Sequence, residues 1–185
     1  MTAFQTINAR LCVGILTAGM VWLGSVMTAS AQTPPPPAAP QLVFAFEETV
    51  ALGDGIPVGA TPFGMRNIVP ITGGTFSGPG NGAGIKGTII PGGWDWQLGL
   101  PNGCAAIKAD YMLKTDDGVV INVINTGKLC GPREGEVAVP NYTTPVFEAP
   151  LGKYEWLGRT TFIGTLEGAT FDGKPAVCIR FYRVQ

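Results

Sequence analysis

Short β-like segments separated by clusters of glycine and proline limit most strongly what this chain can fold into. Runs rich in Val, Ile, Phe, Tyr and Thr alternate with these clusters, and no long segment keeps an amphipathic helical period. We expect eight strands, at residues 42–52, 66–76, 84–90, 94–98, 105–115, 119–126, 160–171 and 176–184. Eight antiparallel strands suit a closed barrel, because closure leaves no exposed sheet edge, although an open sandwich would show the same alternation. The predicted fold class is therefore an all-β, antiparallel eight-stranded barrel with one short helical turn, at residues 150–158, that caps a barrel end.

The clearest hairpin turns at residues 116–118, Asp-Asp-Gly, which predicts a type I turn followed by a left-handed glycine. In this register, residues whose numbers sum to 234 face each other, so Cys104 faces Cys130 within disulfide range. We therefore predict a Cys104–Cys130 disulfide, which a bulge at Gly127 would prevent. Cys178 is then left as an unpaired thiol, expected to be a small buried side chain.

The N-terminal region has the pattern of a secretory signal peptide. Arg10 precedes an apolar run, and Ala29-Ser30-Ala31 forms an A-x-A cleavage site before Gln32. We expect a signal peptide at residues 1–31, a proline-rich linker at 32–41 and one β-barrel domain at 42–185. This organisation predicts a periplasmic or secreted protein in an oxidising compartment.

The composition excludes several classes of function. The chain contains no histidine, which removes Ser-His-Asp and Cys-His catalysis and the imidazole ligands of most zinc and copper sites. Cleavage removes only Arg10 among the charged residues, so 11 basic and 13 acidic residues remain and the net charge is −2. A net charge of −2 does not favour binding to nucleic acid. No second apolar run is long enough to span a membrane. We expect that the protein uses no cofactor and no metal. Its predicted partner is a small-molecule ligand or substrate, and assembly into a homo-oligomer is left open.

Two acidic side chains are candidates for chemistry inside the barrel. An extended backbone at residues 94–96 places two indoles on one face and Asp95 on the other. If Asp95 points inward, it is a carboxylate with a raised pKa, as a general acid or base requires. The alternatives are that it pairs with Arg66 or caps the preceding Gly-Gly turn. Glu48 alternates with Phe44 and Phe46, so it shares their apolar face or lies at a wet strand end.

Several motifs together resemble a family of bacterial and fungal proteins, DUF3237, also called UPF0311. The matching segments are residues 64–76, 78–79, 91–93 with 95–96, 111–118 and 154–157, within a region from about residue 42 to 184. The resemblance implies a lipocalin-like, calycin-type barrel with a small-molecule pocket at its mouth. It also implies, for some relatives, cofactor-free cyclase or isomerase chemistry on aromatic molecules.

Two functional hypotheses follow for the barrel mouth. In the first, the protein binds a small aromatic or apolar molecule, with Trp96, Trp156 and Glu48 as ligand-binding residues. In the second, it is a cofactor-independent isomerase, cyclase or dehydratase, with Asp95, Tyr111 and Arg66 as catalytic residues. In that case Asp95 is the general acid or base, Tyr111 or Glu48 is its counterpart, and Arg66 stabilises an oxyanion. A purely structural role in the cell envelope is the third alternative.

Overall fold

The computed structural model describes residues 37–137 and 140–185. The predicted signal peptide and half of the predicted linker, residues 32–36, lie outside the described residues. The compact unit considered below spans Ala38–Gln185. No helix capable of crossing a bilayer occurs in the part of the chain that the structure describes.

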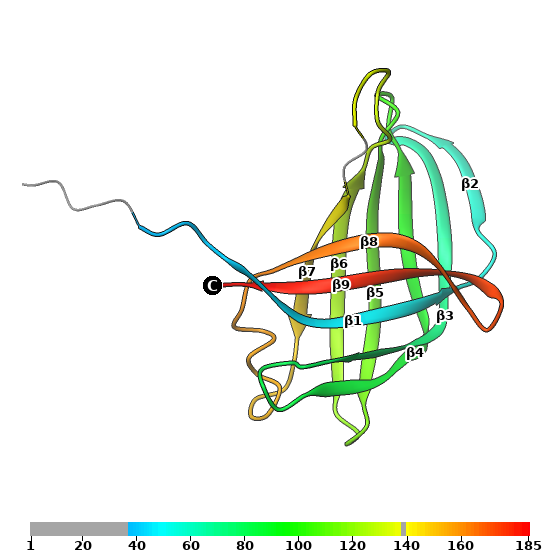
Figure 1. The fold of residues 1–185 in the computed structure, drawn as a ribbon. Helices are drawn as coiled ribbons and strands as arrows, with labels where there is room; N and C mark the ends of the chain where they lie inside the picture. The colour runs from blue at the N-terminus through cyan, green and yellow to red at the C-terminus, as the bar shows by residue number, and fades with distance from the viewer. Residues whose placement is uncertain (1–36, 138–139) are drawn as a thin grey trace, which may run out of the picture. The chain divides into compact units, whose positions relative to one another are not determined.

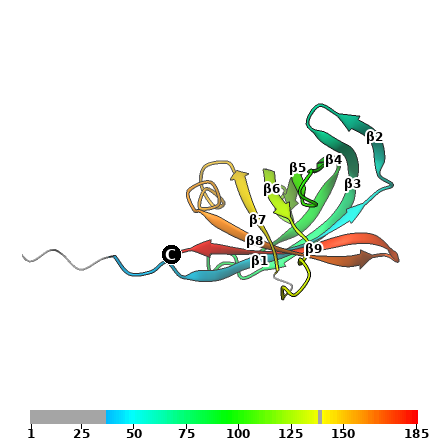
Figure 2. The same cartoon turned by 90° about the horizontal axis from the view of Figure 1, so that it is seen from above.

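Nine antiparallel strands form one sheet in the described residues. They are β1 (Leu42–Leu52), β2 (Ile56–Thr61), β3 (Gly64–Gly78), β4 (Ile85–Gly99), β5 (Ala105–Thr115), β6 (Val120–Leu129), β7 (Asn141–Glu148), β8 (Phe162–Phe171) and β9 (Lys174–Val184). The sheet order is β1-β9-β8-β7-β6-β5-β4-β3-β2, and β1 also pairs with β3. This additional pairing closes eight strands into a barrel and leaves β2 on the outer edge of β3 (Figures 1 and 2). The predicted all-β, eight-stranded antiparallel barrel is confirmed, and it is closed rather than an open sandwich.

The strand prediction was nevertheless wrong in three places. It omitted β2 and β7, each of which contains a proline, Pro57 and Pro145. It also divided β4 at residues 91–93, Pro-Gly-Gly, where the strand continues but its pairing with β5 is interrupted between Ile90 and Trp94. These residues therefore make an irregularity within one strand instead of a turn between two. The prediction still reached eight barrel strands, because it counted β4 twice and omitted β7; β2 is not one of the eight strands that close the barrel.

The hairpin of β5 and β6 has the predicted register. Ala105 pairs with Leu129 and Ile107 pairs with Gly127, so no bulge shifts the alignment. Cys104 and Cys130 form the predicted disulfide, with their Cα atoms 4.3 Å apart. Cys178, by contrast, is half-buried on the outer face of β9 and not in the core, because its neighbours Val177 and Ile179 point into the barrel and successive residues of a strand face opposite sides.

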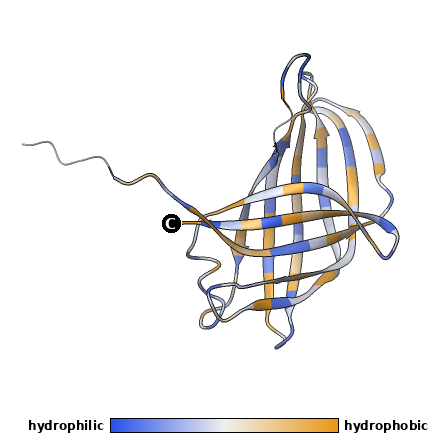
Figure 3. Ribbon diagram, viewed as in Figure 1, coloured by the Kyte–Doolittle hydropathy of each residue, from blue (hydrophilic) through white to orange (hydrophobic). Residues whose placement is uncertain are grey.

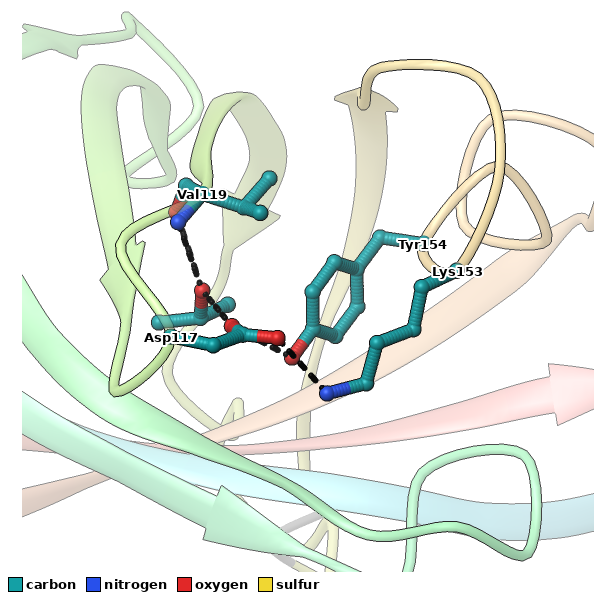
Figure 4. Close-up of polar contacts among 5 residues, drawn as sticks. Asp117, Val119, Lys153 and Tyr154 are labelled. Carbon is teal, nitrogen blue, oxygen red and sulfur yellow. Dashed lines mark hydrogen bonds and ion pairs between the residues drawn. The ribbon is translucent and has the colours of Figure 1, made fainter.

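Turns cap the end of the barrel opposite the disulfide. Residues 151–159 form successive turns but no helix; the N–H of Leu157 donates to the carbonyl of Tyr154 over 3.1 Å. Tyr154 and Leu157 are buried, as expected for a cap. Asp117, in the β5–β6 turn, accepts hydrogen bonds from Tyr154 Oη at 2.9 Å and Lys153 Nζ at 2.7 Å (Figure 4). These bonds join the cap to the barrel.

Aromatic side chains fill the barrel near the cap. Hydrophobic and hydrophilic residues alternate along the strands, so one face of each strand is suited to the interior (Figure 3). Phe46 contacts Phe181, with ring centroids 4.9 Å apart, and Phe147 lies 5.0 Å from Phe162. Phe76 also packs against Phe46. Because these rings occupy the capped half, space for a ligand must be sought in the other half.

Candidate functional site

A row of three residues crosses the inner face of the barrel. Asp95 of β4 pairs with Ala109 of β5, and Ala109 pairs with Asn125 of β6. The side chains of all three face the interior, where Asn125 is only 1% exposed. Because Ala109 carries only a methyl group, the row leaves a gap between the carboxylate of Asp95 and the amide of Asn125.

A cavity of about 70 Å³ lies over this row, in the half of the barrel nearest the disulfide. Most of its wall is apolar and comes from both sides of the barrel, including Ile71, Ile107, Leu166, Val177 and Ile179. Four polar side chains also line it: Asp95, Gln97, Tyr111 and Asn125. An apolar cavity with a few converging polar groups is the usual form of a small-molecule site.

Glu48 and Tyr111 form a buried pair at the base of this cavity. Tyr111 Oη donates a hydrogen bond to Glu48 Oε1, and the two residues are 2% and 1% exposed, respectively. A bulge between Phe44 and Phe46 places Phe44 on the outer face, whereas Glu48 faces inward. Glu48 therefore shares the apolar interior with Phe46, as one of the two alternatives predicted, but not with Phe44.

A glycine makes room for Tyr111 on the neighbouring strand. A Cβ atom at Gly93 would lie 2.5 Å from Tyr111 Cβ and 2.8 Å from the carbonyl oxygen of Asp110. Both distances are shorter than real Cβ contacts, so any side chain at residue 93 would clash with β5. Glycine is therefore needed on β4 beside Tyr111.

Burial raises the pKa values of both carboxyl groups in the site. The pKa of Glu48 rises from 4.5 to about 8, although the hydrogen bond from Tyr111 opposes this change. Glu48 is therefore mostly protonated at pH 7. Burial also raises the pKa of Asp95, against the effects of hydrogen bonds from Gln97 and from the backbone of Lys108. The pKa of Tyr111 is raised well above 10, chiefly by burial and then by the charge of Glu48.

A short chain of amides positions Asp95. Gln97 Nε2 donates to Asp95 Oδ2 at 2.9 Å, and Asn67 Nδ2 donates to Gln97 Oε1 at 3.3 Å. The other oxygen, Asp95 Oδ1, is buried without a hydrogen-bond partner in the described chain. Asp95 thus has one oxygen fixed by the protein and one available to a ligand.

Three predicted site residues lie outside this cavity. Arg66 and Trp96 occupy the outer face of the barrel, where they line a surface groove with Lys108, and Trp96 is 44% exposed. The prediction failed because strand alternation sends the neighbours of the inward Asn67 and Asp95 outward. Trp156 lies in the cap and packs against Phe162, at a centroid distance of 5.9 Å. It is therefore at the filled end of the barrel and not at the mouth.

A family model described as "Protein of unknown function (DUF3237)" matches residues 40–184. The chain belongs to the DUF3237 family. It is 36% identical over 133 residues to a UPF0311 protein of Rhodopseudomonas palustris strain TIE-1, a match that covers 66% of this chain and 84% of the relative. The predicted family resemblance is confirmed.

Among the solved structures that resemble this DUF3237 protein are two from bacteria. A conserved protein of unknown function, RPA1785 from Rhodopseudomonas palustris, is 31% identical, with a TM-score of 0.69 over 80% of this chain and all of the other. A beta-barrel like protein from Acinetobacter baumannii AYE is 32% identical, also with a TM-score of 0.69, over 83% of this chain and all of the other. Because these proteins are described by fold or as unknown in function, the function of this chain must be argued from its own residues.

Sequence reasoning missed three polar residues of the site in this DUF3237 protein: Asn67, Gln97 and Asn125. Gln97 and Asn67 could have been found from strand alternation, since Gln97 is two residues from Asp95. Asn125 stands between apolar inward residues on β6, Val123 and Gly127, which was also a usable signal. In the described residues, no group of three His, Cys, Asp or Glu side chains is arranged to hold a metal ion.

Proposed function

We propose that this DUF3237 protein binds a small molecule with an apolar body in the cavity over Ala109. The observation that carries this proposal is the combination of an apolar cavity wall with buried polar groups, Asp95, Tyr111 and Asn125, on one side. Asp95 and Tyr111 are the two predicted catalytic residues that line this cavity. Glu48 accepts the hydrogen bond of the Tyr111 hydroxyl group.

The size of the cavity limits what enters. Its volume of about 70 Å³ is well below the roughly 300–1,000 Å³ of sites for drug-sized ligands. The ligand is therefore very small, or only one end of it enters the barrel. The apolar wall favours an alkyl or aryl group, and the polar row orients it.

We also propose that the protein works outside the cytosol. The signal-peptide pattern at residues 1–31 and the disulfide of Cys104 and Cys130 both favour an oxidising compartment. The test is to express the full chain and determine the N-terminus of the exported protein by mass spectrometry. Cleavage before Gln32 supports the proposal, whereas an intact chain that remains in the cytosol contradicts it.

A cavity-filling variant tests the binding site. Ala109→Leu places three additional carbons in the gap, so binding of small probes such as 1-butanol or butylamine should be lost. Ala106→Leu adds the same carbons at an outward-facing position of β5 and is the matched control. Titrations followed by ¹H–¹⁵N NMR would report both binding and folding. Unchanged binding of both probes by folded Ala109→Leu would contradict this location.

The second candidate function is acid–base catalysis without a cofactor. It is favoured by one observation: two carboxyl groups with raised pKa values, Glu48 and Asp95, flank Tyr111 in one apolar site. In this function Asp95 transfers a proton to or from the substrate, while protonated Glu48 keeps the base of the cavity neutral. Arg66 has no part in it, because it lies on the outer face.

Turnover separates the two candidates. Small-molecule extracts are incubated with catalytic amounts of wild type or Asp95→Asn, and substrates and products are separated by chromatography with mass spectrometry. Conversion by wild type alone, including conversion to an isomer of equal mass, supports catalysis. Retention of a compound without conversion supports binding alone.

A further inference from the structure

Two acceptor oxygens of the cavity lack hydrogen-bond donors. Asp95 Oδ1 and Asn125 Oδ1 are buried and have no hydrogen-bond partner within residues 37–137 and 140–185. Both residues line the cavity. A buried acceptor without a partner is costly, because it has lost its hydrogen bonds to water. The site therefore fits a ligand that donates hydrogen bonds.

The protein supplies no cation to this cavity. No Lys or Arg is among the residues that line it in the described chain. Arg66 and Lys108 lie on the outer face, and Arg180 is paired there with Glu47 at 3.2 Å and Glu167 at 2.6 Å. Burial raises the pKa of Asp95, and the hydrogen bond from Gln97 Nε2 to Asp95 Oδ2 opposes this rise by favouring the charged form. A negative charge on Asp95 therefore has no protein cation beside it among the described residues that line the cavity.

We propose that the cavity binds a small amine in its ammonium form, with N–H groups donating to Asp95 Oδ1 and Asn125 Oδ1. This inference rests on the proposed function, binding in the cavity over Ala109, and names the chemical class of the ligand. The Cα atoms of Asp95 and Asn125 are two strand spacings, about 10 Å, apart. Both side chains line the same cavity, on either side of Ala109, so an ammonium group is proposed to lie between them.

The apolar wall accounts for the rest of the ligand. Ile107, Leu166 and Val177 offer no hydrogen-bonding groups to the body of the molecule, so an alkylamine or arylamine fits better than a polyamine or an amino acid. A ligand carboxylate fits poorly, because its oxygens would face the unpaired acceptor oxygens Asp95 Oδ1 and Asn125 Oδ1.

Three probes of similar shape test the proposal: butylamine, 1-butanol and butyrate. Each is titrated at pH 7 into ¹⁵N-labelled wild type, Asp95→Asn and Asp110→Asn, with ¹H–¹⁵N spectra as the readout. Asp110 is the control, because it lies on β5 next to Ala109 but is exposed on the outer face. The spectra also verify that each variant is folded.

We expect butylamine to bind wild type at least about tenfold more tightly than 1-butanol, because hydrogen bonds between charged partners are about twice as strong as neutral ones. Butyrate should not bind. Asp95→Asn should reduce butylamine binding to the level of 1-butanol, whereas Asp110→Asn should change neither.

The outcomes distinguish this inference from the proposed function. Equal affinity for butylamine and 1-butanol in wild type refutes the amine preference but leaves a binding cavity. A preference for butylamine that persists in Asp95→Asn refutes the assigned contact. If none of the three probes shifts resonances around the cavity, the proposed binding function itself fails.

Discussion

Replacement of Glu48 by glutamine should remove a large pH dependence from the stability of the protein. The pKa of Glu48 is about 8 in the folded protein, against 4.5 for the exposed side chain. Below pH 4.5 the folded and unfolded states both carry the proton, so Glu48 adds no pH dependence there. Between the two pKa values only the folded state keeps it, so stability falls as pH rises.

The magnitude follows from the two pKa values. Each pH unit between them is worth about 1.4 kcal/mol. The free energy of unfolding should therefore fall by about 5 kcal/mol between pH 4.5 and pH 8 because of Glu48 alone. This is a large part of the roughly 5–15 kcal/mol that stabilises most domains. Glutamine has nearly the same shape and keeps an oxygen for Tyr111, but it does not titrate.

The assay is chemical denaturation of the oxidised protein at several pH values, for wild type and Glu48→Gln. The two should be similar at pH 4.5, and the variant should be more stable by about 5 kcal/mol at pH 8. Glu148→Gln, an exposed position on β7, is the matched control and should follow wild type. Parallel curves for wild type and Glu48→Gln would refute the reasoning, because Glu48 would then titrate alike in both states.

Three further predictions concern the scaffold. Replacement of Cys104 and Cys130 by serine should reduce the free energy of unfolding by roughly 3.5 kcal/mol, since the disulfide closes a loop in the unfolded chain; denaturation measures this loss, and unchanged stability would contradict it. Gly93→Ala should destabilise by at least about 1 kcal/mol through its clash with Tyr111, visible as a lower melting temperature, and a neutral result would mean that β4 moves away at little cost. The pKa of Asp117 is lowered by its hydrogen bonds to the cap, so its contribution is present at neutral pH and is lost as pH falls. Asp117→Asn should therefore accelerate hydrogen exchange of the cap, residues 151–159, at pH 7 but not at low pH, and equal exchange at pH 7 would argue against this anchor.

The parts of the fold that were predicted well depend on residues close in sequence. The Asp-Asp-Gly turn sets the register of β5 and β6, and this register led directly to the Cys104–Cys130 disulfide. Strand alternation likewise predicted that Asp95 faces away from the indoles beside it. The first argument uses thirteen residues on either side of Asp117 and the second uses one residue on either side of Asp95, so no knowledge of the rest of the barrel was needed.

Errors arose where distant elements determine the result. Trp156 was placed at the mouth, but only the docking of the cap on the β5–β6 turn decides which end it closes. Trp96 was predicted to bind the ligand, although strand alternation places it on the opposite face of β4 from Asp95. The sequence alone does not distinguish a tryptophan on the outer face of a barrel from one inside it. The proline and glycine residues of β2, β4 and β7 were interpreted as breaks, whereas pairing with neighbouring strands keeps each of them extended.

The sequence by itself therefore determined the strand-rich class, the local registers and the family. Turn chemistry and the two-residue repeat act over a few residues and are visible in one dimension. The tertiary structure alone decided the closure of β1 on β3, the filled and the hollow half of the barrel, and the contact of Glu48 with Tyr111, 63 residues apart. It also decided which buried oxygens were left without donors, because desolvation and hydrogen bonding depend on every strand that surrounds an atom, not on its neighbours along the chain.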